Sequence, residues 1–570
     1  MNAIETLCVL LQGIFDKRFN NFSFEVINLL TGLSNADIVF PKLIDGIYSL
    51  MNEGESVEIK CEALRLAIVT VCGNSNINQN SINEYFMKNE IFEPLSKIIM
   101  LPETSHVAFD GIMLLGILAN YNKHESKNPY LLKISEIRDE AFLQKIMETV
   151  ASICLRCRSQ YIDIQDDDET HKYSVNSVLS YVGTFLPWGG NGDNTRKKIN
   201  DPDPELSFGR LPPADIAILL ILYDLVNNNR RFVAHLAKSI TENDNKSNDQ
   251  TSSDNDGVPV IDFLSFSSYL LQHNRSVRTA GYSKITLLIL TILLEDEMFN
   301  ENICDERKIY CVRLCRQRAP ILASIKTPCP LACTILDISI GFINHNMKKR
   351  LATDLFSLAL RIIYRILCHL KKSRIRLNYH WTELWNSLTG LLKFILSNND
   401  YFNQDRSSIN EVLISAINIL NICITFGDSF LPDPAAYDNL FYEIVRTDEV
   451  FKNLHEILYD QDSNENLENS KKSASQKSFA SSDPDILTNI ITVCEHFHLK
   501  IEAWKLSNNV KFLLPEQVLA IINKNYESLE LSTFEKVDLY VRYSENPYYV
   551  SFLRHVLRVI VEDFKSKAFQ

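Results

Sequence analysis

The chain has 570 residues, of which 46% are hydrophobic and 23% charged, and its formal net charge is −13. The composition is that of a soluble protein, the length exceeds what one compact core needs, and the negative charge argues against a dedicated nucleic-acid-binding protein. Glycine and proline are few, with 17 and 18 residues, which disfavours an all-β chain full of turns.

The thirteen cysteines are scattered and odd in number, which is not the pattern of a disulfide framework. Several of them fall in apolar helical patterns, namely Cys8, Cys61, Cys72, Cys368 and Cys423. We therefore expect reduced thiols in a cytosolic or nuclear protein. The N-terminal stretch lacks a basic region and is amphipathic, so it does not predict a secretory signal.

Residues 1–186 carry apolar side chains mostly at helical spacing, divided by short polar connections such as GNSNINQN and LPETS. Helix, short turn, helix without strand alternation is typical of an α-solenoid. No clean repeat period is visible, so the sequence predicts an all-α, degenerate armadillo/HEAT-like α-solenoid. Because Met1 leads almost directly into an apolar helix, we expect this edge to be preceded by further chain or covered by a partner or another segment.

The remaining chain divides at segments rich in breakers or polar residues. Residues 187–213 are expected to be a linker, and residues 214–460 a central armadillo-like helical region with a disordered insert at 241–257. A second disordered insert is expected at 461–483, followed by C-terminal helices over 484–570. These last helices are predicted at Ile486–His498, Pro515–Asn525, Thr533–Tyr543 and Tyr548–Lys565.

Three apolar runs raise the question of membrane spans: Ala214–Val226, Ile285–Leu294 and Pro330–Asn344. Each is shorter than the ~20 residues that cross a bilayer, and aspartates interrupt two of them. We interpret the runs as helices buried on all sides. The alternative is a multi-pass integral membrane protein of unknown function.

The segment from Cys304 to Arg376 differs in charge from the rest of the chain. It holds fifteen basic and four acidic residues, a net charge of +11, so the remainder carries −24. Such charges usually belong to solvated helix faces with local counter-charges, but they also suit an acidic partner segment or anionic lipid headgroups. The candidate residues for this surface are Lys371, Lys372, Arg374, Arg376, Arg313, Arg316 and Arg318.

No catalytic, cofactor-binding or metal-binding motif is recognisable. Cys154 and Cys157, Cys311 and Cys315, and Cys329 and Cys333 form spaced pairs without a second ligand pair. The densest group of possible ligands, CEHFH at 494–498, offers at most a weak two-ligand site. We therefore predict a protein that is not an enzyme and has no cofactor.

The stretch SRIRLNYHWTELWNSLTGLLKFILSNN at 373–399 stands out for two reasons. From Trp381 onward its apolar residues recur at i, i+3, i+4 and i+7, which predicts a central core helix. The stretch also resembles the armadillo-like helical domain-containing protein 3 family. Further blocks resemble the same family in the same order, and together they cover nearly the whole chain: LCVLLQG at 7, FEVINLLTG at 24, NYNKHESKNPY at 120, PCPLACTILD at 328, TFGDSFLP at 425 and PEQVL at 515.

The resemblance implies a fungal member that is shorter at its N-terminus than other members. It further implies a non-enzymatic scaffold of cytosol and Golgi that associates peripherally with the membrane. By resemblance its partners are phosphatidylinositol 4-kinase IIIβ and an Arf exchange factor, in support of Golgi organisation, phosphatidylinositol 4-phosphate supply and secretion. Peripheral contact with an anionic Golgi membrane is expected, with integral membrane insertion as the lesser alternative. No nucleic-acid partner is expected.

Overall fold

The computed structural model describes residues 1–165, 208–242, 258–315, 328–347, 352–398, 406–456, 486–532 and 540–568. Within these ranges the chain is helical, and its one β-type pairing is an isolated bridge between Tyr310 and Cys329. The all-α armadillo-like solenoid predicted from the sequence is therefore confirmed. The predicted insert at 461–483 and most of the linker and of the insert at 241–257 lie outside the described residues.

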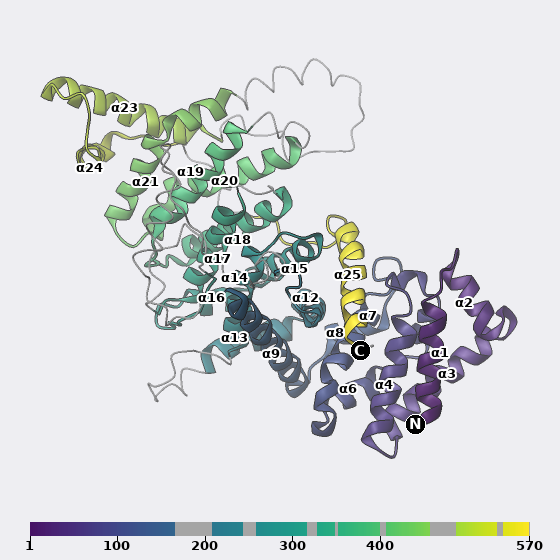
Figure 1. Cartoon of the computed structure of the whole chain (residues 1–570). Helices are drawn as coiled ribbons and strands as arrows, with labels where there is room; N and C mark the ends of the chain where they lie inside the picture. The colour runs from purple at the N-terminus through teal and green to yellow at the C-terminus, as the bar shows by residue number, and fades with distance from the viewer. Residues whose placement is uncertain are drawn as a thin grey trace, which may run out of the picture.

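The N-terminal part consists of helices joined by turns (Figure 1). Its elements are α1 (Asn2–Phe15), α2 (Phe22–Thr31), η1 (Leu33–Asn35), α3 (Ala36–Glu53), α4 (Val57–Val71), η2 (Ile77–Gln79), α5 (Asn83–Lys88), α6 (Phe92–Met100), η3 (Pro102–Val107), α7 (Ala108–Ala119), α8 (Pro129–Glu136) and α9 (Glu140–Gln165).

The central and C-terminal parts continue the array with further helices. They contain η5 (Ala214–Ile218), α12 (Leu219–Asn228), α13 (Arg230–Glu242), α14 (Pro259–Gln272), α15 (Val277–Leu293), α16 (Glu297–Cys304), α17 (Leu331–Asn346), α18 (Thr353–Ser373), α19 (Trp381–Ser397), α20 (Arg406–Phe426), η8 (Gly427–Ser429), α21 (Pro434–Arg446), α23 (Thr488–Asn508), α24 (Pro515–Lys524), η9 (Tyr526–Ser528) and α25 (Val550–Ala568).

Capping residues fix where several helices begin. The Ser276 hydroxyl accepts the backbone N–H of Thr279 at the start of α15, and the Thr279 side chain returns a bond to the Ser276 backbone. At α21 the Asp433 carboxylate accepts the N–H of Ala436 at 2.7 Å, and Pro434 occupies the first helical position. These contacts satisfy backbone donors that the first turn of a helix leaves free.

The helices stack in a ladder in which each contacts those a few positions further along. α9 packs on α14, α14 on α17, α12 on α15, α15 on α18, and α18 on α20. The three apolar runs considered as membrane spans form η5 with α12, the second half of α15, and α17, and nearly all of their side chains are buried. Their apolar character is therefore explained by contact with other helices on all sides.

One described helix, Arg406–Ser429, is long and apolar enough to cross a membrane by length and composition, and two sharply bent helix pairs would bring the total to three. Its most apolar window has a mean hydropathy of 1.7 and is 61% buried inside the protein. The helix contacts α18, α19, α21 and α23. Protein neighbours rather than solvent therefore surround most of its apolar surface.

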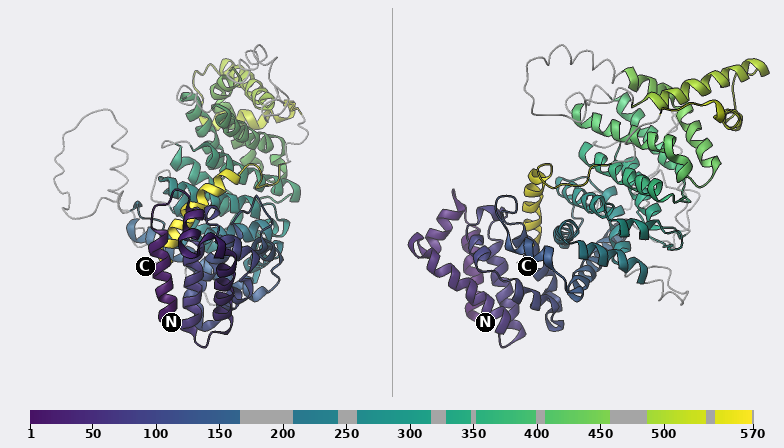
Figure 2. Two further views of the ribbon diagram at one scale, coloured as in Figure 1. Left: turned by 90° about the vertical axis from the view of Figure 1, so that its right-hand side faces the viewer. Right: turned by 180° about the vertical axis from the view of Figure 1, so that it is seen from behind.

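The C-terminal helix departs from the order of the ladder. α25 returns from the far end of the array and packs on η5, α7 and α15, beside the N-terminal part (Figures 1 and 2). Its buried face consists of Leu553, Val556, Leu557, Ile560, Val561 and Phe564. Of the predicted helix Thr533–Tyr543, residues 533–539 lie outside the described ranges, and residues 540–543, with the two that follow, are not helical, so the prediction is wrong for this described part. Residues 540–545 are instead held by contacts of their side chains and backbone with other elements.

Candidate functional site

The predicted basic surface at the end of α18 is partly used by the fold itself. The Arg376 guanidinium donates hydrogen bonds to the backbone carbonyls of Leu431, at 3.1 Å, and Asp428, at 2.8 Å. It thereby fastens the segment after α18 to the turn around η8. Arg374 ends α18 in the left-handed region, with φ of +52°, and its side chain is exposed.

The two lysines of the same surface point in different directions. Lys371 lies over the Phe426 ring, with its ammonium 4.3 Å from the ring centroid. Lys372 forms an ion pair of 2.8 Å with Glu297, and both side chains are about 70% exposed (71% and 69%). A solvated pair of this kind contributes little to stability, so Lys372 remains accessible to a partner. Hydrogen bonding to Glu297 raises the pKa of Lys372, which keeps it charged.

Arg313 does not join this group. It is half-buried beside α14, where its backbone carbonyl accepts a hydrogen bond from Ser265. Arg316 and Arg318 lie outside the described residues. Among the described residues, Lys371, Lys372, Arg374 and Arg376 therefore lie at the end of α18 with side chains directed to different partners, and Arg313 lies elsewhere, in the segment beside α14.

A further cation of the basic segment is buried and structural. The Arg365 side chain is 4% exposed, pairs with Glu295 at 2.6 Å and donates to the Val541 carbonyl at 3.0 Å. Its guanidinium also lies 4.8 Å from the centre of the Tyr540 ring. Burial lowers the pKa of Arg365, against the opposing field of Glu295. Arg365 thus connects α18 and the end of α15 to the segment that leads into α25.

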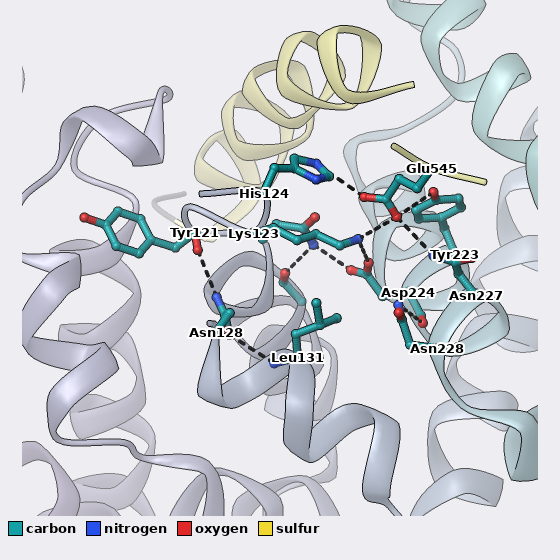
Figure 3. Close-up of polar contacts among 12 residues, drawn as sticks. Tyr121, Lys123, His124, Asn128, Leu131, Tyr223, Asp224, Asn227, Asn228 and Glu545 are labelled. Atoms are coloured by element: carbon teal, nitrogen blue, oxygen red, sulfur yellow. Dashed lines mark hydrogen bonds and ion pairs between the residues drawn. The ribbon is translucent and has the colours of Figure 1, made fainter. Parts of the chain in front are cut away.

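Several buried polar side chains meet in the Lys123 cluster, which we define as Lys123, His124, Tyr223, Asp224 and Glu545 (Figure 3). The Lys123 ammonium lies 2.8 Å from the Asp224 carboxylate and 3.1 Å from that of Glu545. Glu545 also accepts a bond from the Tyr223 hydroxyl at 3.0 Å and lies 3.3 Å from His124 Nε2. These residues come from the loop after α7, from α12 and from the segment before α25.

Burial controls the electrostatics of this cluster. The Lys123, Asp224 and Glu545 side chains are only 6%, 0% and 12% exposed. Burial opposes the charge of Lys123, but the two carboxylates outweigh it, so its pKa is raised. Burial raises the pKa of Asp224 although Lys123 lowers it, and burial lowers the pKa of His124. Lys123 therefore stays charged and holds the two acids together.

Ion pairs along α25 strengthen the same attachment. The Arg278 guanidinium contacts both carboxylate oxygens of Asp563, at 3.0 and 2.8 Å, and the Tyr282 hydroxyl donates to Asp563 at 2.6 Å. Lys567 pairs with Asp215 and lies over the Phe109 ring at 3.8 Å. The helix is thus fixed to α15, η5 and α7 by charge as well as by its apolar face.

In the part of the chain that the structure describes, no group of three or more His, Cys, Asp or Glu side chains is arranged so that it could hold a metal ion. Cys494 donates to the Ile444 carbonyl, and His496 contacts the Asn525 carbonyl at 3.2 Å. Cys154 and Cys157 are buried, and burial raises the pKa of Cys157 to about 12. These side chains serve packing and local hydrogen bonding.

The comparisons with known proteins match this architecture over almost its whole length. A family model for the C-terminal region of armadillo-like helical domain-containing protein 3 matches residues 329–566. The Homo sapiens armadillo-like helical domain-containing protein 3 is 32% identical over 596 residues, which cover 98% of this chain and 82% of the relative. The chain belongs to the armadillo-like helical domain-containing protein 3 family. No solved structure matches it.

Two further relatives show how far the similarity extends. The Danio rerio armadillo-like helical domain-containing protein 3 is also 32% identical, over 98% of this chain and 82% of its own length. A protein of Schizosaccharomyces pombe named as a UPF0588 membrane protein is 25% identical over 81% of this chain and 72% of its own length. The chain is therefore similar to both vertebrate and yeast proteins.

The Lys123 cluster was not predicted from the sequence of this armadillo-like helical domain-containing protein 3 family member. Lys123 is 101 residues from Asp224 and 422 residues from Glu545 in the sequence. One signal was present: Asp224 interrupts an apolar run, and a buried acid in such a run requires a partner. The identity of that partner could not be read from the residues around it.

Proposed function

We propose that the chain is a non-enzymatic scaffold that recruits phosphatidylinositol 4-kinase IIIβ and an Arf exchange factor to the Golgi membrane. The observation that carries the proposal is the family relationship, because 98% of the chain aligns with a vertebrate member. An extended helical array also supports it, since such arrays bind partner segments along large surfaces. The proposal includes peripheral association with an anionic Golgi membrane and support of phosphatidylinositol 4-phosphate supply and secretion.

Within this proposal, the cations at the end of α18, of which Lys372 and Arg374 are exposed and Lys371 is half-buried, help to orient the scaffold or its partner. Lys371, Lys372 and Arg374 are the residues to test, because Arg376 is needed to hold Leu431 and Asp428. Reversal of these three charges to Glu should weaken recruitment while the protein stays folded. A matched variant reverses three exposed cations on other elements, Lys127, Arg138 and Lys393.

The experiment is affinity purification from cells that produce the tagged full chain, with the lipid kinase and the exchange factor measured in the eluate. Both partners should be enriched with the native chain and with the matched variant. Loss of the partners with the α18 variant alone supports the role of the basic surface. Failure of the native chain to enrich either protein would refute recruitment.

An integral membrane protein is the second candidate function. The helix Arg406–Ser429 favours it, as does the name of the Schizosaccharomyces pombe relative, a UPF0588 membrane protein. The contacts of α20 with α18, α19, α21 and α23 favour the scaffold. Extraction of membranes with alkaline carbonate separates the two: release into the supernatant agrees with the scaffold, and retention in the pellet agrees with the integral protein.

A further inference from the structure

The far end of the array carries a group of large apolar side chains that face solvent. We define the α23–α24 tip as residues 499–514. Within it Leu499 is 70% exposed, Leu506 81%, Phe512 87% and Leu514 60%. Figure 1 shows α23 and α24 projecting from the upper end of the molecule, away from α25 and the N-terminal helices. The tip is therefore a convex projection rather than a groove.

Local hydrogen bonds hold the tip in a defined shape. α23 ends at Asn508, and Asn509 follows in the left-handed region with φ of +51°. The Val510 N–H then returns to the Lys505 carbonyl at 3.1 Å, a common way to end a helix. At the other end the Leu514 N–H donates to the Gln517 side chain at 2.9 Å. The loop that carries Phe512 is thus closed by hydrogen bonds on both sides.

The exposed residues are not part of the packed face of α23. That face consists of Asn489, Ile490, Val493, Cys494, Phe497 and Ile501, all in its first fourteen residues. Beyond Ile501 the helix extends past its neighbours, and Ser507 and Asn508 are exposed as well. The fold therefore gains no burial from Leu506 or Phe512, although it exposes their apolar surface to water.

The net positive charge of the tip favours an anionic partner. Residues 499–514 contain Lys500, Lys505, Lys511 and one acid, Glu502, a net charge of +2 in a chain whose net charge is −13. Lys505 pairs with Glu502 at 2.7 Å, and Lys511 is exposed next to Phe512. Exposed Phe and Leu bordered by lysines are typical of segments that lie in the headgroup region of an anionic bilayer.

A second group of exposed apolar side chains, on the first helices, differs from the tip in its net charge. Leu10, Phe24, Leu29 and Ile38 on the first helices are about half exposed (53–57%). Residues 1–39 carry four acids and two basic residues, a net charge of −2. That group is therefore repelled by an anionic surface, whereas the tip is attracted to it.

We infer that the α23–α24 tip inserts Phe512 and the exposed leucines of the tip into the headgroup region of an anionic lipid bilayer, with Lys500 and Lys511 at the phosphates. The inference rests on the proposed peripheral membrane association, but it places the contact at the end of the array rather than at the basic surface of α18. Insertion removes Phe512 and Leu506 from water without unfolding any part of the chain.

The test measures binding of the purified full chain to vesicles of phosphatidylcholine with and without phosphatidylserine. Burial of one Phe side chain changes an equilibrium by about 10- to 100-fold. Phe512→Glu should therefore weaken binding to the anionic vesicles by about tenfold or more, with an unchanged circular dichroism spectrum. Leu29→Glu, which adds the same charge at an exposed apolar residue outside the tip, should bind as the native chain does.

A depth measurement identifies the inserted element. Trp504 lies within the tip and is half-buried, whereas Trp381 and Trp385 are buried in α19. Brominated lipids should quench part of the tryptophan fluorescence of the native chain on binding, and Trp504→Phe should abolish that part. Loss of quenching in Trp504→Phe with binding retained supports insertion of the tip.

Three results would overturn the inference. They are absence of binding of the folded native chain to anionic vesicles, equal binding of Phe512→Glu, and a dimer in light scattering that Phe512→Glu converts to a monomer. The last result would assign the tip to a second copy of the chain. Because only protein and lipid are present, failed vesicle binding leaves partner recruitment standing, and failed partner capture with intact vesicle binding refutes recruitment alone.

Discussion

Replacement of Lys123 by Met should release the C-terminal helix from the body of the protein. The change removes the cation that lies between Asp224 and Glu545 but keeps a side chain of similar length. Removal of one partner from a buried ion pair costs about 3–5 kcal/mol, because the other charge stays buried without compensation. Asp224 keeps its bond from Asn120, and Glu545 keeps those from Tyr223 and Asn227, so we expect about 3–4 kcal/mol.

The assay is hydrogen–deuterium exchange of peptides from α25, since local opening is measured there directly. A loss of this size should accelerate exchange in α25 by about 100-fold or more, at 1.4 kcal/mol per factor of ten. The double variant Lys123→Met, Asp224→Asn also removes one of the two unpaired acids. Its loss of stabilising free energy should therefore be clearly less than the sum of the losses in the two single variants. Acceleration of less than about fivefold in Lys123→Met would refute the role assigned to the cluster.

Three further predictions concern other contacts. Arg376→Ala should lower the free energy of unfolding by about 1 kcal/mol, because two hydrogen bonds to backbone carbonyls are lost. Arg374→Gly should raise the free energy of unfolding by about as much, because glycine tolerates positive φ. Urea unfolding compares the two variants, and equal effects would contradict the geometry. Asp563→Asn should weaken its bond pair with Arg278, cost about 1–3 kcal/mol and accelerate exchange in α25 but not in α3. Burial lowers the pKa of His369, so the unfolded chain binds a proton at a higher pH than the folded chain does. The contribution of His369 to stability is therefore present above about pH 6.5 and is lost as the pH falls through that value. In thermal unfolding from pH 7.5 to 5, the stability of His369→Asn should decline less steeply than that of the native chain.

The sequence predicted the elements whose cause is local. The apolar face of the stretch after Arg376 appears as α19, with Trp381, Leu384, Trp385 and Leu388 buried. Its periodicity was enough because one helix face determines its burial. The three apolar runs were likewise interpreted correctly as buried helices, since their length and their aspartates argued against a bilayer.

Features that depend on distant partners could not be predicted in the same way. Arg365 appeared as one charge of a basic segment, but Glu295 and the Val541 carbonyl make it a buried connector. Tyr543 was assigned to a helix, but its contacts with Tyr223 and Glu295 hold it in an irregular segment. In both cases contacts with residues far along the chain outweigh local propensity.

The return of α25 has a consequence for the order in which the chain can fold. In a simple ladder of helices each unit finds its neighbours soon after synthesis, so folding follows the chain. Here the contacts of Phe109, Asp215 and Arg278 with α25 can form only after that helix has left the ribosome, hundreds of residues later. Until then their apolar and charged surface stays open, so the nascent chain offers a binding face for chaperones that the finished protein does not. The slowest step of folding should accordingly be the docking of this helix, which requires closure of the longest loops in the chain.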